Sequence, residues 1–104
     1  MRIRHTVTFT FYETTTENQI EDVITRLNNM GEYLQREIGV TDWSVQKHIP
    51  ETFRPGRAHL LQDGIFPSIE ALSMHADSVE HKHVVELTPK VCGWMTIDTV
   101  IADD

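Results

Sequence analysis

The feature that most constrains the fold is a strand followed by a helix of the same length. Residues 3–11 alternate between apolar and polar side chains, which is the period of a strand with one buried face. From residue 17 to residue 38, apolar side chains instead recur every three or four positions, which is the period of a helix. A strand of about ten residues and a helix of about 22 are both roughly 33 Å long. The helix can therefore lie back along the whole strand.

The ends of this helix are marked by local signals. Thr16 and Gln19 form a capping-box pattern at its start, and Gly39 is a plausible stop one residue after the last periodic position. Gly31 interrupts the pattern and should lower helix stability by up to about 1 kcal/mol relative to Ala. The sequence therefore predicts one long helix with a weak point near its C-terminal end.

The remaining segments complete an alternation of strands and helices. Three further strands are predicted over residues 40–49, 58–66 and 94–101. Between the last two, a helical region begins at Ser68, breaks, continues after a cap at Asp77 and ends at Pro89. The order βαββαβ is typical of the ferredoxin-like α+β fold, in which both helical segments cover one face of a four-stranded antiparallel sheet. We expect residues 1–104 to form a single domain of this kind.

The other face of such a sheet is not covered within one chain. In the first strand it would carry Thr6, Thr8 and Thr10, and in the last strand we place Trp94 and Val100 on it. A second copy could cover a half-apolar sheet face of this kind, so we expect a homodimer.

Composition excludes several classes of partner. The chain of 104 residues carries a net charge of −7 and no cluster of Lys or Arg, which argues against a nucleic-acid binder. The single cysteine, Cys92, cannot form an internal disulfide and is interpreted as a small structural residue. No apolar run approaches the length of a membrane span. We therefore expect a cytoplasmic protein that binds neither nucleic acid nor membrane.

His5 is the exception on the apolar face of the first strand, among Ile3, Val7, Phe9 and Phe11. An imidazole there is either satisfied by a neighbouring carbonyl or carboxylate, or lines a pocket. Both interpretations stay open at this point.

The remaining histidines raise a metal hypothesis that their spacing does not favour. His75 and His81 are six residues apart, so on a continuous helix they point to different sides, and only a break near Asp77 could bring them together. His48 and His59 are predicted to be cross-strand neighbours with a structural role. We predict no metal site and no cofactor.

Two further sets of side chains have simple interpretations. Trp43 and Trp94 could stack on an aromatic ligand, although such side chains are more often core or interface anchors. Asp98, Asp103 and Asp104 are interpreted as solvated charge.

Taken together, these segments resemble the stress-responsive α/β-barrel (Dabb) family over nearly the whole chain. The resemblance rests on four stretches: IRHTVTFTF, TTENQIEDVITRLNNM, FPSIEALSMHADSVEHKHVVE and GWMTIDTVIADD. It implies a dimeric α/β barrel with the helices outside and a cavity between each sheet and its helices.

One family member, the plant polyketide cyclase olivetolic acid cyclase, closes a polyketide chain by an aldol reaction with two His and two Tyr. On this resemblance its two histidines correspond to His5 and His81. Its two tyrosines correspond to His75 and Leu27, and the first His and the Pro of its His-Pro-x-His segment correspond to Ser78 and Val79. Of the four catalytic residues, this sequence therefore keeps the two histidines and lacks the two tyrosines.

The resemblance leads to two main functional expectations. The first is a module that binds a small hydrophobic or aromatic molecule in the cavity. The second is a cyclase-like enzyme with His5 and His81 as general acid and base, and a monooxygenase of the same barrel fold is a further alternative. We expect the ligand to be contacted by His75, Val7, Phe9, Leu27 and Trp43.

Overall fold

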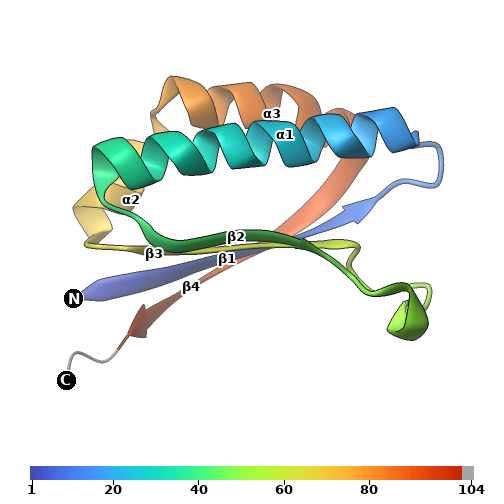
Figure 1. Cartoon of the computed structure of the whole chain (residues 1–104), viewed down its shortest axis with the longest axis horizontal. Coiled ribbons are helices and arrows are strands. Elements are labelled where there is room, and N and C mark those ends of the chain that lie inside the picture. Colours follow the sequence, from blue (N-terminus) through green and yellow to red (C-terminus); the bar gives the residue numbers. More distant parts are fainter. Residues whose placement is uncertain (102–104) are drawn as a thin grey trace.

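The computed structural model describes residues 1–101, which form one antiparallel sheet covered by helices on one face (Figure 1). The strands are β1 (Arg2–Phe11), β2 (Thr41–Lys47), β3 (Leu60–Phe66) and β4 (Cys92–Ile101). The helices are α1 (Glu17–Tyr33), α2 (Ile69–Ala76) and α3 (Val79–Val91). A π-helical turn, η1 (Leu34–Ile38), extends α1, and a 3₁₀ turn, η2 (Pro50–Thr52), lies between β2 and β3.

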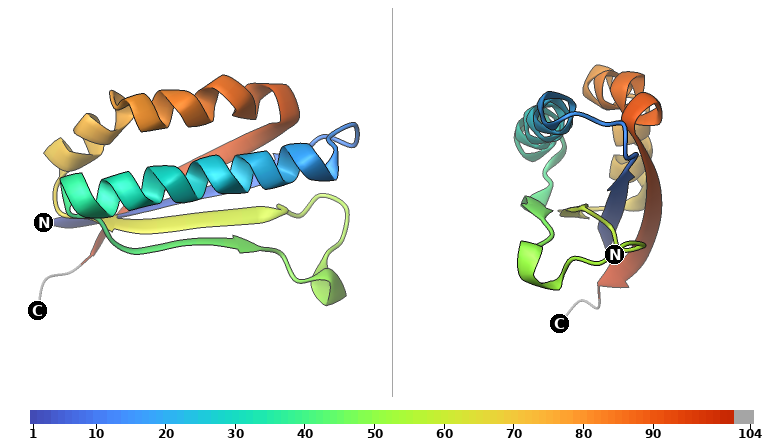
Figure 2. Two further views of the ribbon diagram at one scale, coloured as in Figure 1. Left: turned by 45° about the horizontal axis from the view of Figure 1, so that its top comes forward. Right: turned by 90° about the vertical axis from the view of Figure 1, so that its right-hand side faces the viewer.

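The strand order in the sheet is β2-β3-β1-β4, with every neighbouring pair antiparallel. Figure 2 shows α1 and α3 side by side on one face and no helix on the other. This arrangement confirms the predicted ferredoxin-like α+β fold. No helix within residues 1–101 is long and apolar enough to cross a membrane.

The first helix begins where the capping signals predict. The Gln19 amide donates to the Thr16 hydroxyl, and the Thr16 amide donates to the Gln19 side chain. The helical path ends at Gly39, whose φ of +86° is a left-handed conformation that glycine adopts without strain.

Gly31 is explained by packing against Trp43. A Cβ atom at Gly31 would lie 2.1 Å from Trp43 Nε1, and one at Gly64 would lie 2.9 Å from the same indole. The two glycines therefore make room for Trp43 between α1 and β3. The helix gives up some intrinsic stability at Gly31 so that the indole fits between α1 and β3.

The helical region after β3 differs from the prediction in two details. Ser78, not Asp77, caps α3, since its hydroxyl accepts from the His81 amide, and Asp77 instead ends α2. Pro89 does not end α3, which continues to Val91. A proline this close to the helix end removes a single backbone hydrogen bond, and Val91 is only 1% exposed in the core.

The prediction that Trp94 and Val100 lie on the open face of the sheet is wrong. Trp94 lies opposite Phe9, and Val100 lies opposite Ile3, so both are on the helix side of the sheet. The open face carries Met95 and Ile97 instead, at 77% and 61% exposure. The register decides this, because it pairs each odd-numbered residue of β1 with an even-numbered residue of β4.

Cys92 has the structural role that was predicted. It is fully buried, and its thiol donates to the Thr88 carbonyl at 3.3 Å. Burial raises the pKa of the Cys92 thiol to about 11, so the reactive thiolate form is suppressed at neutral pH.

Candidate functional site

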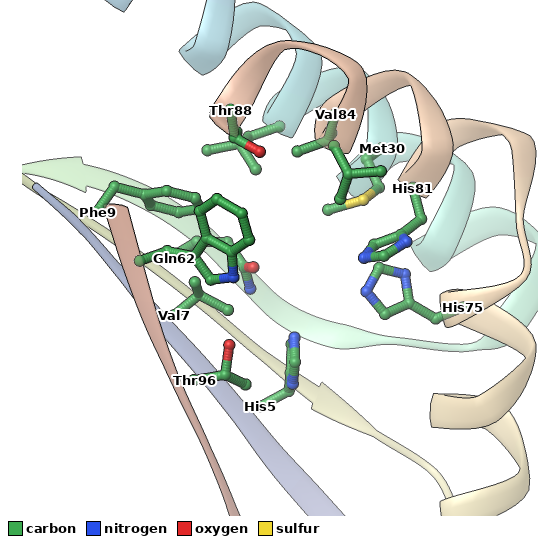
Figure 3. Close-up of a pocket in the computed structure, with 13 residues that line it drawn as sticks. His5, Val7, Phe9, Met30, Gln62, His75, His81, Val84, Thr88 and Thr96 are labelled. Atoms are coloured by element: carbon green, nitrogen blue, oxygen red, sulfur yellow. The ribbon is translucent and has the colours of Figure 1, made fainter. Parts of the chain in front are cut away.

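A cavity of about 90 Å³ lies between the sheet and the helices, and three histidines line it (Figure 3). Its apolar wall comes from β1, α1 and α3: Val7, Phe9, Leu27, Met30, Val84 and Val85. Its polar groups are His5, Gln62, His75, His81, Thr88 and Thr96. Figure 3 shows His5 rising from the sheet toward His75 and His81, which come from the helical side.

His5 is held by a carboxylate on the neighbouring strand. Asp98 lies directly opposite His5 in the β1–β4 register, and their Nδ1 and Oδ1 atoms are 2.5 Å apart. The side chain of His5 is 12% exposed and that of Asp98 is 41% exposed. Asp98 is exposed, as expected of a solvated charge, but the register also makes it the partner of His5, which the sequence did not indicate. Asp103 and Asp104, which were interpreted in the same way, lie outside the described residues.

The break between α2 and α3 brings His75 and His81 together. The Ser78 hydroxyl donates to the His75 carbonyl at 2.8 Å and accepts from the His81 amide at 3.1 Å. The chain turns around this serine, and the two imidazole rings meet edge to face with centroids 4.6 Å apart. His75 is also 5.6 Å from the His5 ring, so the three imidazoles form one row.

The two helical histidines are neutral at physiological pH. Burial, reinforced by the nearby His81 and His5, lowers the pKa of His75 to about 3. Burial also lowers the pKa of His81, opposed by a backbone hydrogen bond to Ala76 and assisted by His5. His75 and His81 therefore present uncharged imidazoles to anything that enters the cavity.

Two buried polar atoms in this cavity have no hydrogen-bond partner among the described residues. They are the amide nitrogen Nε2 of Gln62, a residue 1% exposed, and Nδ1 of His75, a residue 3% exposed. An unpaired buried polar group costs about 1–3 kcal/mol, so native proteins rarely keep one without a reason. Both residues line the cavity.

The structure brings together most of the residues expected at a ligand site. His5, His75 and His81 line the cavity with Val7, Phe9 and Leu27. Trp43 does not: its indole lies between Gly31 and Gly64, where it is part of the core. Trp94 lines the cavity instead, because the register turns it to the helix side.

Sequence reasoning missed Gln62 and Asp98. Gln62 follows Leu60 and precedes Gly64 and Phe66 on the helix-facing side of β3, so a polar residue in that alternating row was a usable signal. Asp98 gave no such signal, because its partner depends on the register between two strands more than ninety positions apart.

His48 and His59 are cross-strand neighbours, as predicted. The His48 amide donates to the His59 carbonyl at 2.9 Å across the connection between β2 and β3. Within residues 1–101, no group of three or more His, Cys, Asp or Glu side chains is placed to hold a metal ion.

No protein-family model and no curated protein matches the sequence, whereas several solved structures match the fold. A dabb family protein with a ferredoxin-like fold from Mesorhizobium loti has a TM-score of 0.70 at 21% identity, over 98% of both chains. This chain has the fold of a dabb protein.

Two further solved structures share this dabb-type fold. A dimeric ferredoxin-like protein of unknown function from Thermobifida fusca has a TM-score of 0.82 at 16% identity, covering 97% of this chain and 92% of that one. The hydroxynitrile lyase from Passiflora edulis has a TM-score of 0.74 at 16% identity, covering 99% of this chain and 95% of that one. At these identities the likeness establishes the fold, and function must be argued from the cavity.

Proposed function

We propose that the cavity is an active site for general acid–base catalysis on a small uncharged carbonyl compound, with His5 as the base. The observation that carries this proposal is the His5–Asp98 hydrogen bond at the wall of a cavity that also holds the unpartnered Gln62 amide. That one enzyme with this fold is a lyase is consistent with such chemistry.

The hydrogen bond to Asp98 sets the tautomer of His5. A carboxylate can only accept, so the His5 ring hydrogen lies on Nδ1 and is donated to Asp98. The lone pair on Nε2 is then free to take a proton from a substrate. The Asp98 charge would stabilise the imidazolium that forms, which is the role of a carboxylate behind a histidine base.

Gln62 supplies the complementary group. Its unpartnered amide nitrogen can donate to an oxygen that becomes negative when a neighbouring C–H bond loses its proton. A base and an oxygen-directed donor in one cavity suit proton removal next to a carbonyl, the step that begins aldol and enolisation reactions.

The size of the cavity limits what enters it. About 90 Å³ corresponds to roughly three water molecules and is smaller than the cavity of about 150 Å³ that accepts a benzene ring. We infer that the reacting end of a substrate enters, while larger substituents extend past Trp94 and Val85, which line the cavity and stay partly exposed.

A second candidate function is binding of a small hydrophobic molecule without catalysis. The observation that favours it is the apolar wall, to which β1, α1 and α3 all contribute. In that case His5 and Gln62 would orient the ligand through hydrogen bonds, and no bond would be broken.

We also propose that the open face of the sheet is covered by a second copy of the chain. Met95 and Ile97 are highly exposed there, and they lie opposite Thr8 and Thr6 on β1. The match to the dimeric Thermobifida fusca protein supports this. Met95→Asp should convert a dimer to a monomer in sedimentation, while Met74→Asp, at another exposed position on α2, should not.

The experiment that tests the catalytic proposal follows exchange of α-protons. Small ketones and aldehydes are incubated with the protein in D₂O, and loss of their α-proton signals is followed by NMR. His5→Ala should reduce any catalysed exchange by about 100-fold or more, and His83→Ala, at an exposed position, should not. Unchanged exchange in His5→Ala would overturn the proposal. Chemical-shift changes at the cavity without exchange would favour simple binding.

A further inference from the structure

A second and larger cavity lies outside the His5 cavity and shares no lining residue with it. It has a volume of about 360 Å³ and is formed by the end of β1, the first turns of α1 and the connection between β2 and β3. This volume lies within the range of about 300–1,000 Å³ typical of small-molecule pockets. The side chains that matter for the argument are Phe11, Ile20, His48, Phe53, His59 and Leu60.

Aromatic rings form one wall of this cavity. The Phe53 ring stacks on the His59 ring with centroids 4.7 Å apart and an interplanar angle of 28°. His48 packs edge to face against Phe53 at 5.5 Å, and Phe11 lies 5.7 Å from His59. A flat apolar surface of this kind favours a planar ring as ligand.

His59 contributes a hydrogen-bond donor of known position. Its Nδ1 accepts from the Phe11 amide at 3.0 Å, so the ring hydrogen must lie on Nε2. Among residues 1–101, Nε2 has no hydrogen-bond partner. Both ring nitrogens of His48 are occupied, by the Ala58 carbonyl at 3.0 Å and the Thr52 hydroxyl at 2.9 Å. His59 is therefore the histidine that can bind a ligand here.

The charges around the cavity argue against an anionic ligand. Lys47 lines the cavity but forms an ion pair with Glu21 at 2.9 Å, and Glu17 adds a carboxylate to the rim. An anion would have to compete with Glu21 for the ammonium and would face Glu17. An uncharged molecule meets neither penalty.

We propose that this cavity binds a small, uncharged, planar aromatic molecule that carries one hydrogen-bond acceptor. The ring lies against Phe53 and the apolar side chains of Ile20 and Leu60, and the acceptor receives the His59 Nε2 hydrogen. The site is independent of the proposed catalysis at His5, since no residue is shared.

The test uses anisole, which has an ether oxygen but no carbonyl, and ethylbenzene, which has nearly the same shape and no acceptor. Titration of ¹⁵N-labelled protein should shift the amide signals of Phe53, His59 and Leu60. Anisole should bind several-fold more tightly than ethylbenzene. Phe53→Ala should weaken anisole binding at least fivefold, while His5→Ala should leave it unchanged.

Three results would overturn the proposal. They are shifts confined to the His5 cavity, equal affinity for the two compounds, and unchanged anisole affinity in Phe53→Ala. Because His59→Ala would also remove the acceptor of the Phe11 amide, Phe53→Ala is the primary variant. If these amide signals instead shift on dilution of the protein alone, a second copy occupies the cavity, and the proposal fails.

Discussion

Two groups of histidines differ in how many of their ring nitrogens have hydrogen-bond partners: His48 and His59 in the connection between β2 and β3, and His5, His75 and His81 in the cavity. In the connection between β2 and β3, three of the four ring nitrogens of His48 and His59 have partners in the backbone or in Thr52. In the cavity between sheet and helices, His5 is held by Asp98, but His75 Nδ1 is buried without a partner. His48 and His59 hold the connection in place and leave one ring nitrogen, His59 Nε2, without a partner among residues 1–101, whereas the cavity group leaves the buried His75 Nδ1 without one.

The difference follows from where each group sits. His48 and His59 lie at the end of a strand pair, where free backbone carbonyl and amide groups are close enough to bond an imidazole. His5 and His75 line a cavity with a largely apolar wall; the backbone of His5 is paired within the sheet, and the carbonyl of His75 is used by Ser78. Stability and activity should therefore respond to different histidines.

The largest expected effect is on activity, at the partner of His5. Asp98→Asn removes the charge that holds the His5 tautomer, and loss of a hydrogen bond to a charged group is worth about 1.5–3 kcal/mol. We expect α-proton exchange to fall by roughly 10- to 100-fold. Asp63→Asn is the matched control: Asp63 binds Arg4 and Thr6 on the other face of the sheet, so it should leave the rate unchanged.

Substitutions at His48, in the connection between β2 and β3, should lower stability and leave activity unchanged. His48→Ala removes two hydrogen bonds, and we expect the free energy of unfolding to fall by about 2 kcal/mol with no change in exchange rate. Thr52→Ala removes only the bond to Nε2 and should lose about half as much. Denaturant unfolding measures both values. If His48→Ala is fully folded and still exchanges α-protons more slowly, the separation between histidines for stability and histidines for activity would be contradicted.

The pH dependence of stability sharpens the comparison further. The folded protein takes up a proton at His75 only near pH 3, whereas the unfolded chain does so near pH 6.5. Below pH 6.5 the unfolded state binds more protons, so stability falls with decreasing pH by up to about 1.4 kcal/mol per unit from this one group. Denaturant unfolding between pH 7 and pH 4 measures the slope.

Two variants isolate the contribution of His75. His75→Gln cannot titrate, so its stability should depend less steeply on pH than that of the unmodified protein. His83→Gln changes an exposed histidine and should keep the original slope. Equal slopes in all three proteins would show that His75 is not protected from protons by burial. The lowered pKa of His81 acts in the same direction and is present in every variant.

The smallest expected effect is a gain in stability at Gln62. Gln62→Leu replaces a buried, unpartnered amide by an apolar side chain, and we expect about 1 kcal/mol of additional stability. The same change should weaken binding of carbonyl compounds, because the oxygen-directed donor is lost. Gln46→Leu, at an exposed position on β2, should change stability by less than about 0.5 kcal/mol. A destabilised Gln62→Leu would mean that the amide has a structural partner.

Local patterns were sufficient for most of the fold. The alternation in β1, the capping box at Thr16 and the left-handed stop at Gly39 each depend on residues close together in sequence. Pro89 was misjudged, because the core burial of Val91 outweighs the single hydrogen bond that the proline removes. The family resemblance also indicated which face of β1 borders the cavity, and the structure places Val7, Phe9 and Leu27 there.

By itself, the sequence determined the order of elements, the helix caps and the anomaly of His5 on an apolar face, because each is a matter of spacing along the chain. Tertiary structure alone decided that Asp98 is the partner of His5, that Trp94 replaces Trp43 at the cavity and that His75 meets His81. The positions of Asp98 and Trp94 depend on the register between β1 and β4. The contact between His75 and His81 depends on the turn around Ser78. A shift of one residue in that register would move Asp98 and Trp94 to the other face of the sheet.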